Sequence, residues 1–330
     1  MHTFRFPFQA MACHCEVVLA TDPTDADPAR LEVHAHAQGQ ARGQARGQAE
    51  RQAQTAIDEV LRIEAKFSRY REDSVIARIN AAAGHDPVVC DSETAQLLAY
   101  ADQLHRISGG LFDITAGVLR RAWNFKEPRL PAPEVLEPLL ALIGWDRVQH
   151  RGHTVHLPVA GMQLDFGGFG KEYAADRAGA MLQRAGVKHG YVNLGGDMRF
   201  IGPKPGGAPW MVGIQHPRVT GEVVATLPMF SGGLATSGDY ERYFEIDGQR
   251  YCHILDPRTG MPVKHWRSVS AMAPLAVVAG NATTIAMLAQ AQGLDFLRSS
   301  GLKFLAVDAQ GDIHTQVAPE LEPAEPPAGA

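Results

Sequence analysis

The sequence predicts a single large α+β domain of mixed sheets and helices. Its 330 residues, 45% of them hydrophobic and 20% charged, are enough for one large globular domain. Helical and strand-like patterns are mixed along the chain without a regular strand–helix–strand rhythm, which favours α+β over a doubly wound parallel sheet. We expect the domain to span residues 1–320 and a Pro/Ala-rich tail to occupy residues 321–330.

The first third of the chain predicts a strand, an insertion and two helices. Residues 11–20 have the character of a strand, and residues from about 30–54 contain a Gln-Ala-Arg-Gly repeat. The spaced glycines of this repeat weaken a helix, so we interpret it as a low-complexity insertion. A helical spacing of apolar residues then continues to Phe67. Residues 92–110 begin with the capping residue Ser92 and end on two glycines, which predicts a helix.

Helices and strands are mixed in the rest of the chain. Residues 131–144 predict a helix started by proline, and residues 162–185 predict a strand, a Gly-Gly turn and a helix from about Lys171. Residues 190–217 predict strands around a second Gly-Gly turn, and residues 279–301 predict a further helix.

The run from Tyr243 to Leu255 predicts a β-hairpin closed by Asp247-Gly248, because Asp-Gly suits a two-residue turn. His253 lies at the end of this hairpin, three residues ahead of Asp-Pro-Arg-Thr-Gly. A titratable ring beside a sharply specified loop suits a functional site, and the alternative is a packed histidine next to a structural turn.

Charge, hydropathy and cysteine content exclude several classes of protein. The net charge of -5 argues against a bulk electrostatic grip on nucleic acid, and no apolar run approaches the ~18 residues of a membrane span. Without a signal-peptide pattern at the N-terminus, we expect a cytoplasmic location. The four cysteines show no disulfide spacing, which fits a reducing compartment. Cys13-His14-Cys15 could hold a soft metal, but two ligands do not make a zinc site.

Three glycine-rich or acidic turns are further candidates. LDFGGFGKEYA, residues 164–174, could place backbone amides and Lys171 against a phosphate, and the alternative is a tight strand-to-helix turn. Asp197 follows Gly195-Gly196, which is commonly a plain turn, and Asp113 is typical of a helix cap.

Six segments, in order over almost the whole chain, resemble the blocks of one family. They are FSRYREDSVIARIN, GGLFDITAGVL, LDFGGFGKEYAADRA, VNLGGDMRFIG, ATSGDYERYFEIDGQRYCHILDPRTGMPV and SVSAMAPLAVVAGNATTIAML. AMACHCEV, around Met11, is similar to the family's first block. With them the chain resembles the ApbE-like FAD:protein FMN transferases, which implies an ApbE-like, T-fold-related architecture.

The resemblance implies binding of FAD and Mg²⁺, and transfer of FMN to an acceptor flavoprotein that bears a Ser/Thr flavinylation motif, with release of AMP. His253 matches the family's histidine, which would act as the catalytic base. The implied metal ligands are Asn281, Thr284 and a backbone carbonyl near Gly168. The implied FAD contacts are Met11, Tyr70, Leu111, Phe112, Asp113, Asp165, Lys171 and Leu255.

The chain departs from the family pattern at the metal block. The family reads Ala-Asp-Ala-x-x-Thr, and here Asn281 replaces the Asp while Ile285 replaces the Thr. Lys-Gly-Tyr-Ala has become Lys-Glu-Tyr-Ala at Glu172, and Met-Gly-Thr has become Met-Ala-Cys. Mg²⁺ favours carboxylates over neutral oxygens. A catalytically weak FAD-binding protein and a metal-dependent FAD pyrophosphatase therefore stay open as alternatives.

Overall fold

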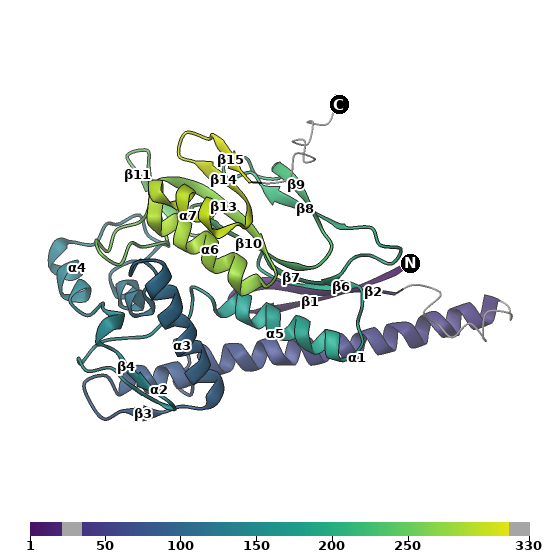
Figure 1. Ribbon diagram of the computed structural model, residues 1–330, viewed down its shortest axis with the longest axis horizontal. Helices are drawn as coiled ribbons and strands as arrows, with labels where there is room; N and C mark the ends of the chain where they lie inside the picture. Colours follow the sequence, from purple (N-terminus) through teal and green to yellow (C-terminus); the bar gives the residue numbers. More distant parts are fainter. Residues whose placement is uncertain (22–34, 317–330) are drawn as a thin grey trace.

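The computed structural model describes residues 1–21 and 35–316, and an eight-stranded sheet lies at its centre (Figure 1). Every neighbouring pair of strands in this sheet is antiparallel. In spatial order the strands are β1 (His2–Ala10), β2 (Cys13–Thr21), β6 (Gly190–Leu194), β7 (Asp197–Gly202), β10 (Gly232–Gly238), β13 (Trp266–Ala273), β14 (Lys303–Asp308) and β15 (Ile313–Thr315). The predicted tail at 321–330 lies outside the described residues.

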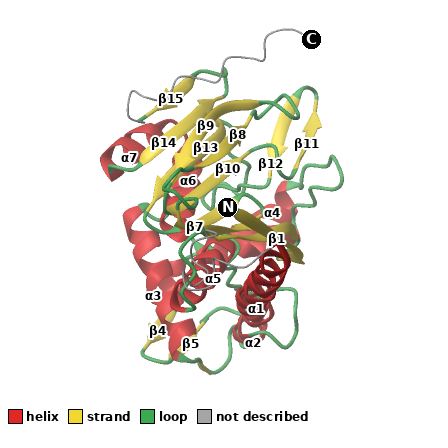
Figure 2. Cartoon of the chain, turned by 90° about the vertical axis from the view of Figure 1, so that its right-hand side faces the viewer, coloured by secondary structure: helices red, strands yellow, loops and turns green. Residues whose placement is uncertain are grey.

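Helices cover one face of this sheet, and a two-stranded hairpin covers the other (Figures 1 and 2). On β2, Val17 and Leu19 belong to the core beneath the helices, while Val18 belongs to the core beneath the hairpin. Successive strand residues point to opposite faces, so this continuous apolar run serves both layers. The covering elements are α1 (Ala35–Phe67), α5 (Gly170–Arg184), α6 (Ala276–Ala289), η5 (Gln290–Gln292), α7 (Gly293–Ser300), β8 (Trp210–Gln215) and β9 (Val223–Met229).

A second region of short elements lies beside the helical layer. Its small sheet has the order β3-β5-β4, and a separate antiparallel hairpin is formed by β11 and β12. The elements are α2 (Val75–Ala81), β3 (Val88–Val89), α3 (Ser92–Ile107), η3 (Ile114–Arg121), α4 (Pro133–Leu140), η4 (Trp145–Arg147), β4 (Gln149–Arg151), β5 (Thr154–His156), β11 (Tyr243–Ile246) and β12 (Gln249–Cys252).

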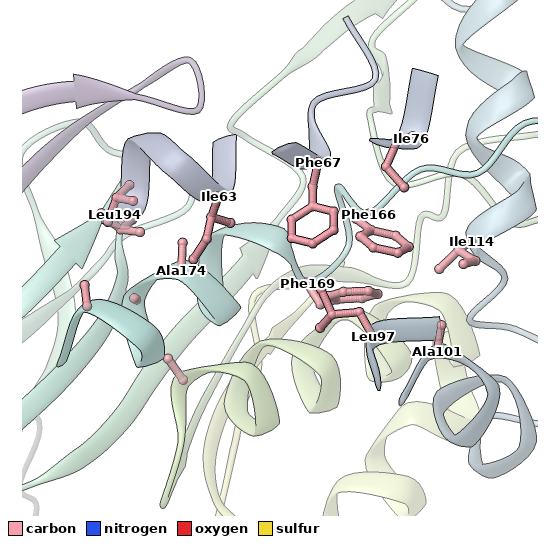
Figure 3. Close-up of a cluster of buried hydrophobic side chains, with 14 of the residues drawn as sticks. Ile63, Phe67, Ile76, Leu97, Ala101, Ile114, Phe166, Phe169, Ala174 and Leu194 are labelled. Carbon is pink, nitrogen blue, oxygen red and sulfur yellow. The ribbon is translucent and has the colours of Figure 1, made fainter. Parts of the chain in front are cut away.

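Buried aromatic rings join the two regions (Figure 3). Phe67, at the end of α1, lies 5.5 Å from Phe166 between ring centroids, and Phe166 lies 4.9 Å from Phe169. Phe169 is fully buried directly before α5. This cluster fixes the glycine-rich loop in front of α5 on the core, which positions the residues of the candidate site.

Several predicted elements are confirmed. The β11–β12 hairpin closes on Asp247 and Gly248, whose φ angles of 51° and 73° are those of a two-residue hairpin turn. The predicted helix from Ser92 is α3, but its N-cap is Asp91, whose carboxylate accepts a hydrogen bond from the Thr94 amide at 2.9 Å.

Three boundary predictions were wrong. The predicted strand at 11–20 starts only at Cys13, because Met11 and Ala12 form a tight turn with positive φ after the unpredicted strand β1. Residues 162–166 are not a strand: their backbone bonds to the Asn80 side chain and to a carbonyl of η3. The final predicted helix is divided at Gln290, whose φ is 50°.

The predicted insertion coincides in part with helix α1. Residues 35–54 are helical there, and residues 30–34 lie outside the described part of the chain. Ala49 and Ala53 are buried in the core that α1 shares with α5. The small side chains of the repeat therefore allow close packing at its C-terminal end. None of the described helices is both long and apolar enough to cross a membrane.

Candidate functional site

The glycine-rich loop before α5 is tightly tied to its neighbours. The Asp165 carboxylate accepts a hydrogen bond from the Gly167 amide at 2.8 Å and pairs with Arg69 at 3.0 Å. A Cβ at Gly168 would lie 2.9 Å from the Phe112 ring, so only glycine fits there without movement. The loop thus joins three of the predicted contact residues, namely Phe112, Asp165 and Gly168.

Lys171 lies in the first turn of α5 and forms an ion pair with Asp197 of β7. The Asp197 side chain is buried, so the Gly-Gly-Asp turn is more than a plain turn: it delivers a carboxylate to this lysine. Burial alone would lower the pKa of Lys171, but the charges of Asp197 and Glu172 outweigh burial and raise it. Lys171 is therefore a permanent cation at the loop.

His253 follows β12 directly, and its amide donates to the Arg242 carbonyl at 3.0 Å. Its ring Nδ1 is buried and has no hydrogen-bond partner among the described residues. Burial, followed by the charges of Arg242, Arg120 and Lys171, lowers the pKa of His253 to about 3. The imidazole is thus neutral at pH 7 and lies within the field of three cations.

Arg120 and Arg242 also act on His253, although neither is among the predicted site residues. Burial lowers the pKa of Arg120, and the charge of Arg242 lowers it further. Asp165 and Tyr70 act on Arg120 in the opposite sense. A signal was available, because each arginine lies in or directly after one of the blocks that carried the resemblance.

The first block lies beside Lys171. The Met11 amide donates to the Glu64 carboxylate at 2.6 Å, which holds the turn before β2. The Cys13 and Cys15 sulfurs are 3.5 Å apart. The hydrogen bond from Cys15, opposed by burial and assisted by the charge of Lys171, lowers the pKa of Cys13 to about 7. Among the described residues no group of three His, Cys, Asp or Glu side chains is placed to hold a metal, so Cys13-His14-Cys15 gains no further ligand.

Asp113 is confirmed as a helix cap. Its carboxylate accepts hydrogen bonds from the Thr115 amide at 2.7 Å and from the Trp145 amide at 3.0 Å. These bonds occupy both oxygens, so the carboxylate holds η3 and η4 in place. Leu111, just before it, is partly buried against the core of the last helices, while Phe112 is buried.

Tyr70 and Leu255 occupy opposite environments. Tyr70 is 80% exposed, with the Arg69 guanidinium 5.7 Å from its ring centroid, so its face is available to a ligand ring. Leu255 pairs with Pro262 across the Asp-Pro-Arg-Thr-Gly loop and packs on the aromatic cluster of the β11–β12 hairpin. Asp256, paired with Arg258 at 2.7 Å, closes this loop.

The predicted metal residues of α6 are only partly suited to a cation. Asn281 is 3% exposed, and its Oδ1 has no hydrogen-bond partner in the part of the chain that the structure describes. The Thr284 hydroxyl lies 3.3 Å from the Ser237 hydroxyl. Ile285, which stands at the family's threonine position, is buried in the core and offers no oxygen.

A cavity of about 760 Å³ opens elsewhere, next to β8 and the N-terminal strands. Arg5, Tyr191, Trp210 and Tyr240 are among its lining residues, which include none of the predicted flavin or metal residues. It lies on the hairpin side of the sheet, where Trp210, Ile214 and Leu234 of the core beneath the hairpin are among its lining residues.

Comparisons with known proteins identify the family of the chain. Residues 24–306 match the ApbE family. The FAD:protein FMN transferase of Haemophilus influenzae is 30% identical over 74% of this chain and 75% of its own length, and that of Treponema pallidum is 36% identical over 66% and 67%.

Solved structures resemble the whole fold. The ApbE protein of Thermotoga maritima has a TM-score of 0.82 at 30% identity, covering 95% of this chain and 97% of its own. The apo form of the flavinyl transferase ApbE of Pseudomonas stutzeri has a TM-score of 0.78 at 27% identity, covering 96% and 94%. Because residues 24–306 match the family and the fold is shared with these structures, the chain belongs to the ApbE family.

Proposed function

We propose that this protein is an FAD:protein FMN transferase. It moves FMN from FAD to a Ser/Thr hydroxyl of an acceptor flavoprotein that carries a flavinylation motif, and it releases AMP. One observation carries the proposal: a neutral His253, with an unpartnered Nδ1, lies in the field of Arg120, Arg242 and Lys171. Three cations around a base suit a substrate whose reacting group is a diphosphate.

The same cations explain how the base becomes active. Without substrate, burial and then the charges of these cations hold the pKa of His253 at about 3, which makes the imidazole a weak base. A bound diphosphate would neutralise the cations and raise the pKa of His253 by removing their part of the shift, while the effect of burial remains. The base would then be effective only when FAD is in place, which protects the protein from unproductive proton transfer.

The transfer step balances with these residues. The acceptor hydroxyl oxygen attacks the FMN-side phosphorus, and its proton passes to His253. The bond between this phosphorus and the bridging oxygen breaks, and AMP leaves with that oxygen. Lys171, Arg120 and Arg242 stabilise the charge that builds on the phosphate oxygens. Tyr70 and Phe112 would contact the flavin part of the substrate, as the resemblance implies.

The oxygen donors of the site fit magnesium. Asn281 presents a buried Oδ1 without a partner, and the resemblance adds Thr284 and the Gly168 carbonyl. When bound, the ion would supply neutralisation of the diphosphate charge. A neutral amide in place of a carboxylate also favours a second candidate function, a FAD-binding protein with slow transfer, because Ile285 offers no oxygen.

The test is chromatography of nucleotides after incubation with FAD and Mg²⁺, with and without an acceptor domain. The transferase predicts that AMP appears only with the acceptor, while free FMN does not accumulate. Release of both AMP and FMN without acceptor would instead identify a pyrophosphatase. Bound FAD with no AMP in either sample would identify the FAD-binding protein. The cytoplasmic location stays a prediction.

A further inference from the structure

Glu172 is a buried carboxylate that forms no ion pair with another described residue. It lies in the first turn of α5 and is only 7% exposed. Its Oε2 has no hydrogen-bond partner, and no ion pair joins it to a basic side chain within the described ranges 1–21 and 35–316. The charge of Lys171 acts on Glu172, but the Lys171 ammonium group is paired with Asp197. A buried carboxylate normally needs a partner, so this one calls for an explanation.

The absence of a side chain at Gly280 makes room for Glu172. A Cβ at Gly280 would overlap Oε1 and would lie 2.6 Å from Cγ and 2.8 Å from Cδ of the glutamate. The carboxyl group therefore lies directly on the backbone of α6, one residue before Asn281. The two helices are adapted to each other at this point, because alanine at 280 would displace the glutamate.

Asn281, the residue after Gly280, contributes a second unpartnered oxygen. Its Nδ2 donates to the Tyr100 hydroxyl at 2.6 Å, which fixes the amide, while Oδ1 is buried and unpartnered. Burial, with the charges of Asp176 and Glu172, raises the pKa of Tyr100, so the phenol lies near both carboxylates. Asp176 itself is satisfied by the Ala276 and Val277 amides, each at 2.9 Å. The two unpartnered oxygens, Glu172 Oε2 and Asn281 Oδ1, are thus the ones left for a ligand.

We infer that Glu172 and Asn281 together bind a divalent cation, with Glu172 on α5 supplying the carboxylate charge. The inference deepens the proposed function and rests on it for the role of the ion. Two oxygens from the protein, completed by water and substrate phosphate, are a usual set for Mg²⁺. Three departures from the family pattern meet here: Glu172 for glycine, Gly280 for alanine and Asn281 for aspartate. The Glu172 carboxylate on α5 thus replaces the carboxylate that α6 lacks at Asn281.

The test measures binding of Mn²⁺, a paramagnetic stand-in for Mg²⁺, by electron paramagnetic resonance of the free ion. The titration is made with the full chain, without FAD, and again with ADP as a diphosphate. We expect Glu172→Gln to weaken Mn²⁺ binding at least tenfold and Asn281→Asp to strengthen it. Glu50→Gln, which removes an exposed carboxylate of α1, is the matched control and should bind as the wild type does.

Folding is checked separately. Glu172→Gln should not lower the melting temperature without metal, because glutamine has nearly the same shape as glutamate and carries no ionisable group that burial would penalise. Gly280→Ala, which displaces the same carboxylate by a different route, should weaken Mn²⁺ binding as well. Equal Mn²⁺ binding by wild type and Glu172→Gln, or none by either protein in both titrations, would overturn the inference. If Mn²⁺ binding depends on Glu172 but the protein transfers no FMN, the metal site is supported and the proposed function is rejected.

Discussion

The contact between Glu172 and Gly280 predicts a strong coupling between two positions on different helices. In Gly280→Ala, the new methyl group would overlap Oε1 and lie 2.6 Å from Cγ of the glutamate, well inside an ordinary contact. Overpacking of this kind costs about 1–3 kcal/mol. Alanine in a helix interior gains about 1 kcal/mol over glycine. The net change in the wild-type background should therefore be a loss of up to about 2 kcal/mol.

In a Glu172→Ala background the obstacle is gone. Gly280→Ala should then stabilise the protein by up to about 1 kcal/mol, the helix-propensity gain alone. The double-mutant cycle, measured by urea unfolding at pH 7 without metal, should give a coupling of about 1–3 kcal/mol. Additivity within about 0.5 kcal/mol would refute the packing described here.

Three further predictions concern other parts of the chain. His253→Gln should retain FAD binding, measured by flavin fluorescence, and lose transfer. Because the folded pKa of His253 is about 3 against an ordinary 6.5, only the unfolded chain binds this proton between those values, so stability falls as pH drops through that window. Urea unfolding across pH 4–6.5 should show a shallower pH dependence in His253→Gln, and an identical slope would contradict the assignment. Asp113→Ala leaves the Thr115 and Trp145 amides without their acceptor and should cost about 2 kcal/mol in urea unfolding, whereas an unchanged midpoint would show that the cap is dispensable. Deletion of residues 35–45 should leave FAD affinity within about twofold, because it shortens α1 only at its N-terminal end and stops short of the buried Ala49; calorimetry showing a larger loss would assign that segment to the site.

Local signals in the sequence account for much of the fold. The Asp-Gly turn at 247–248 fixes its hairpin without help from the rest of the chain, so this element was predictable. Strand β1 was missed because its turn at Met11 and Ala12 carries neither glycine nor asparagine. Residues 162–166 look like a strand because apolar and polar residues alternate, but Leu164 bonds to the side chain of Asn80, which no local pattern reveals.

Site residues that lie in a recognisable block could be predicted from the sequence. Contacts between elements that are far apart in the sequence could not. Lys171 and His253 were predicted from the resemblance. That the charges of Lys171, Arg120 and Arg242 all act on His253 is seen only in the folded chain. Glu172 stood out in the sequence merely as a departure from a motif. The role inferred for Glu172 depends on its contact with Gly280, which lies on another helix. Helix propensity and hydrophobic periodicity are local and do not predict a contact between two helices.

The central claim is the transfer of FMN to a protein hydroxyl with His253 as base. Intact-protein mass spectrometry of an acceptor domain after incubation with FAD, Mg²⁺ and this protein tests it most directly. The account predicts that the acceptor gains the mass of FMN less one water, that a Ser/Thr→Ala acceptor gains nothing, and that His253→Ala abolishes the gain while still binding FAD. An acceptor of unchanged mass with the wild-type protein, or an equal gain with His253→Ala, would contradict it.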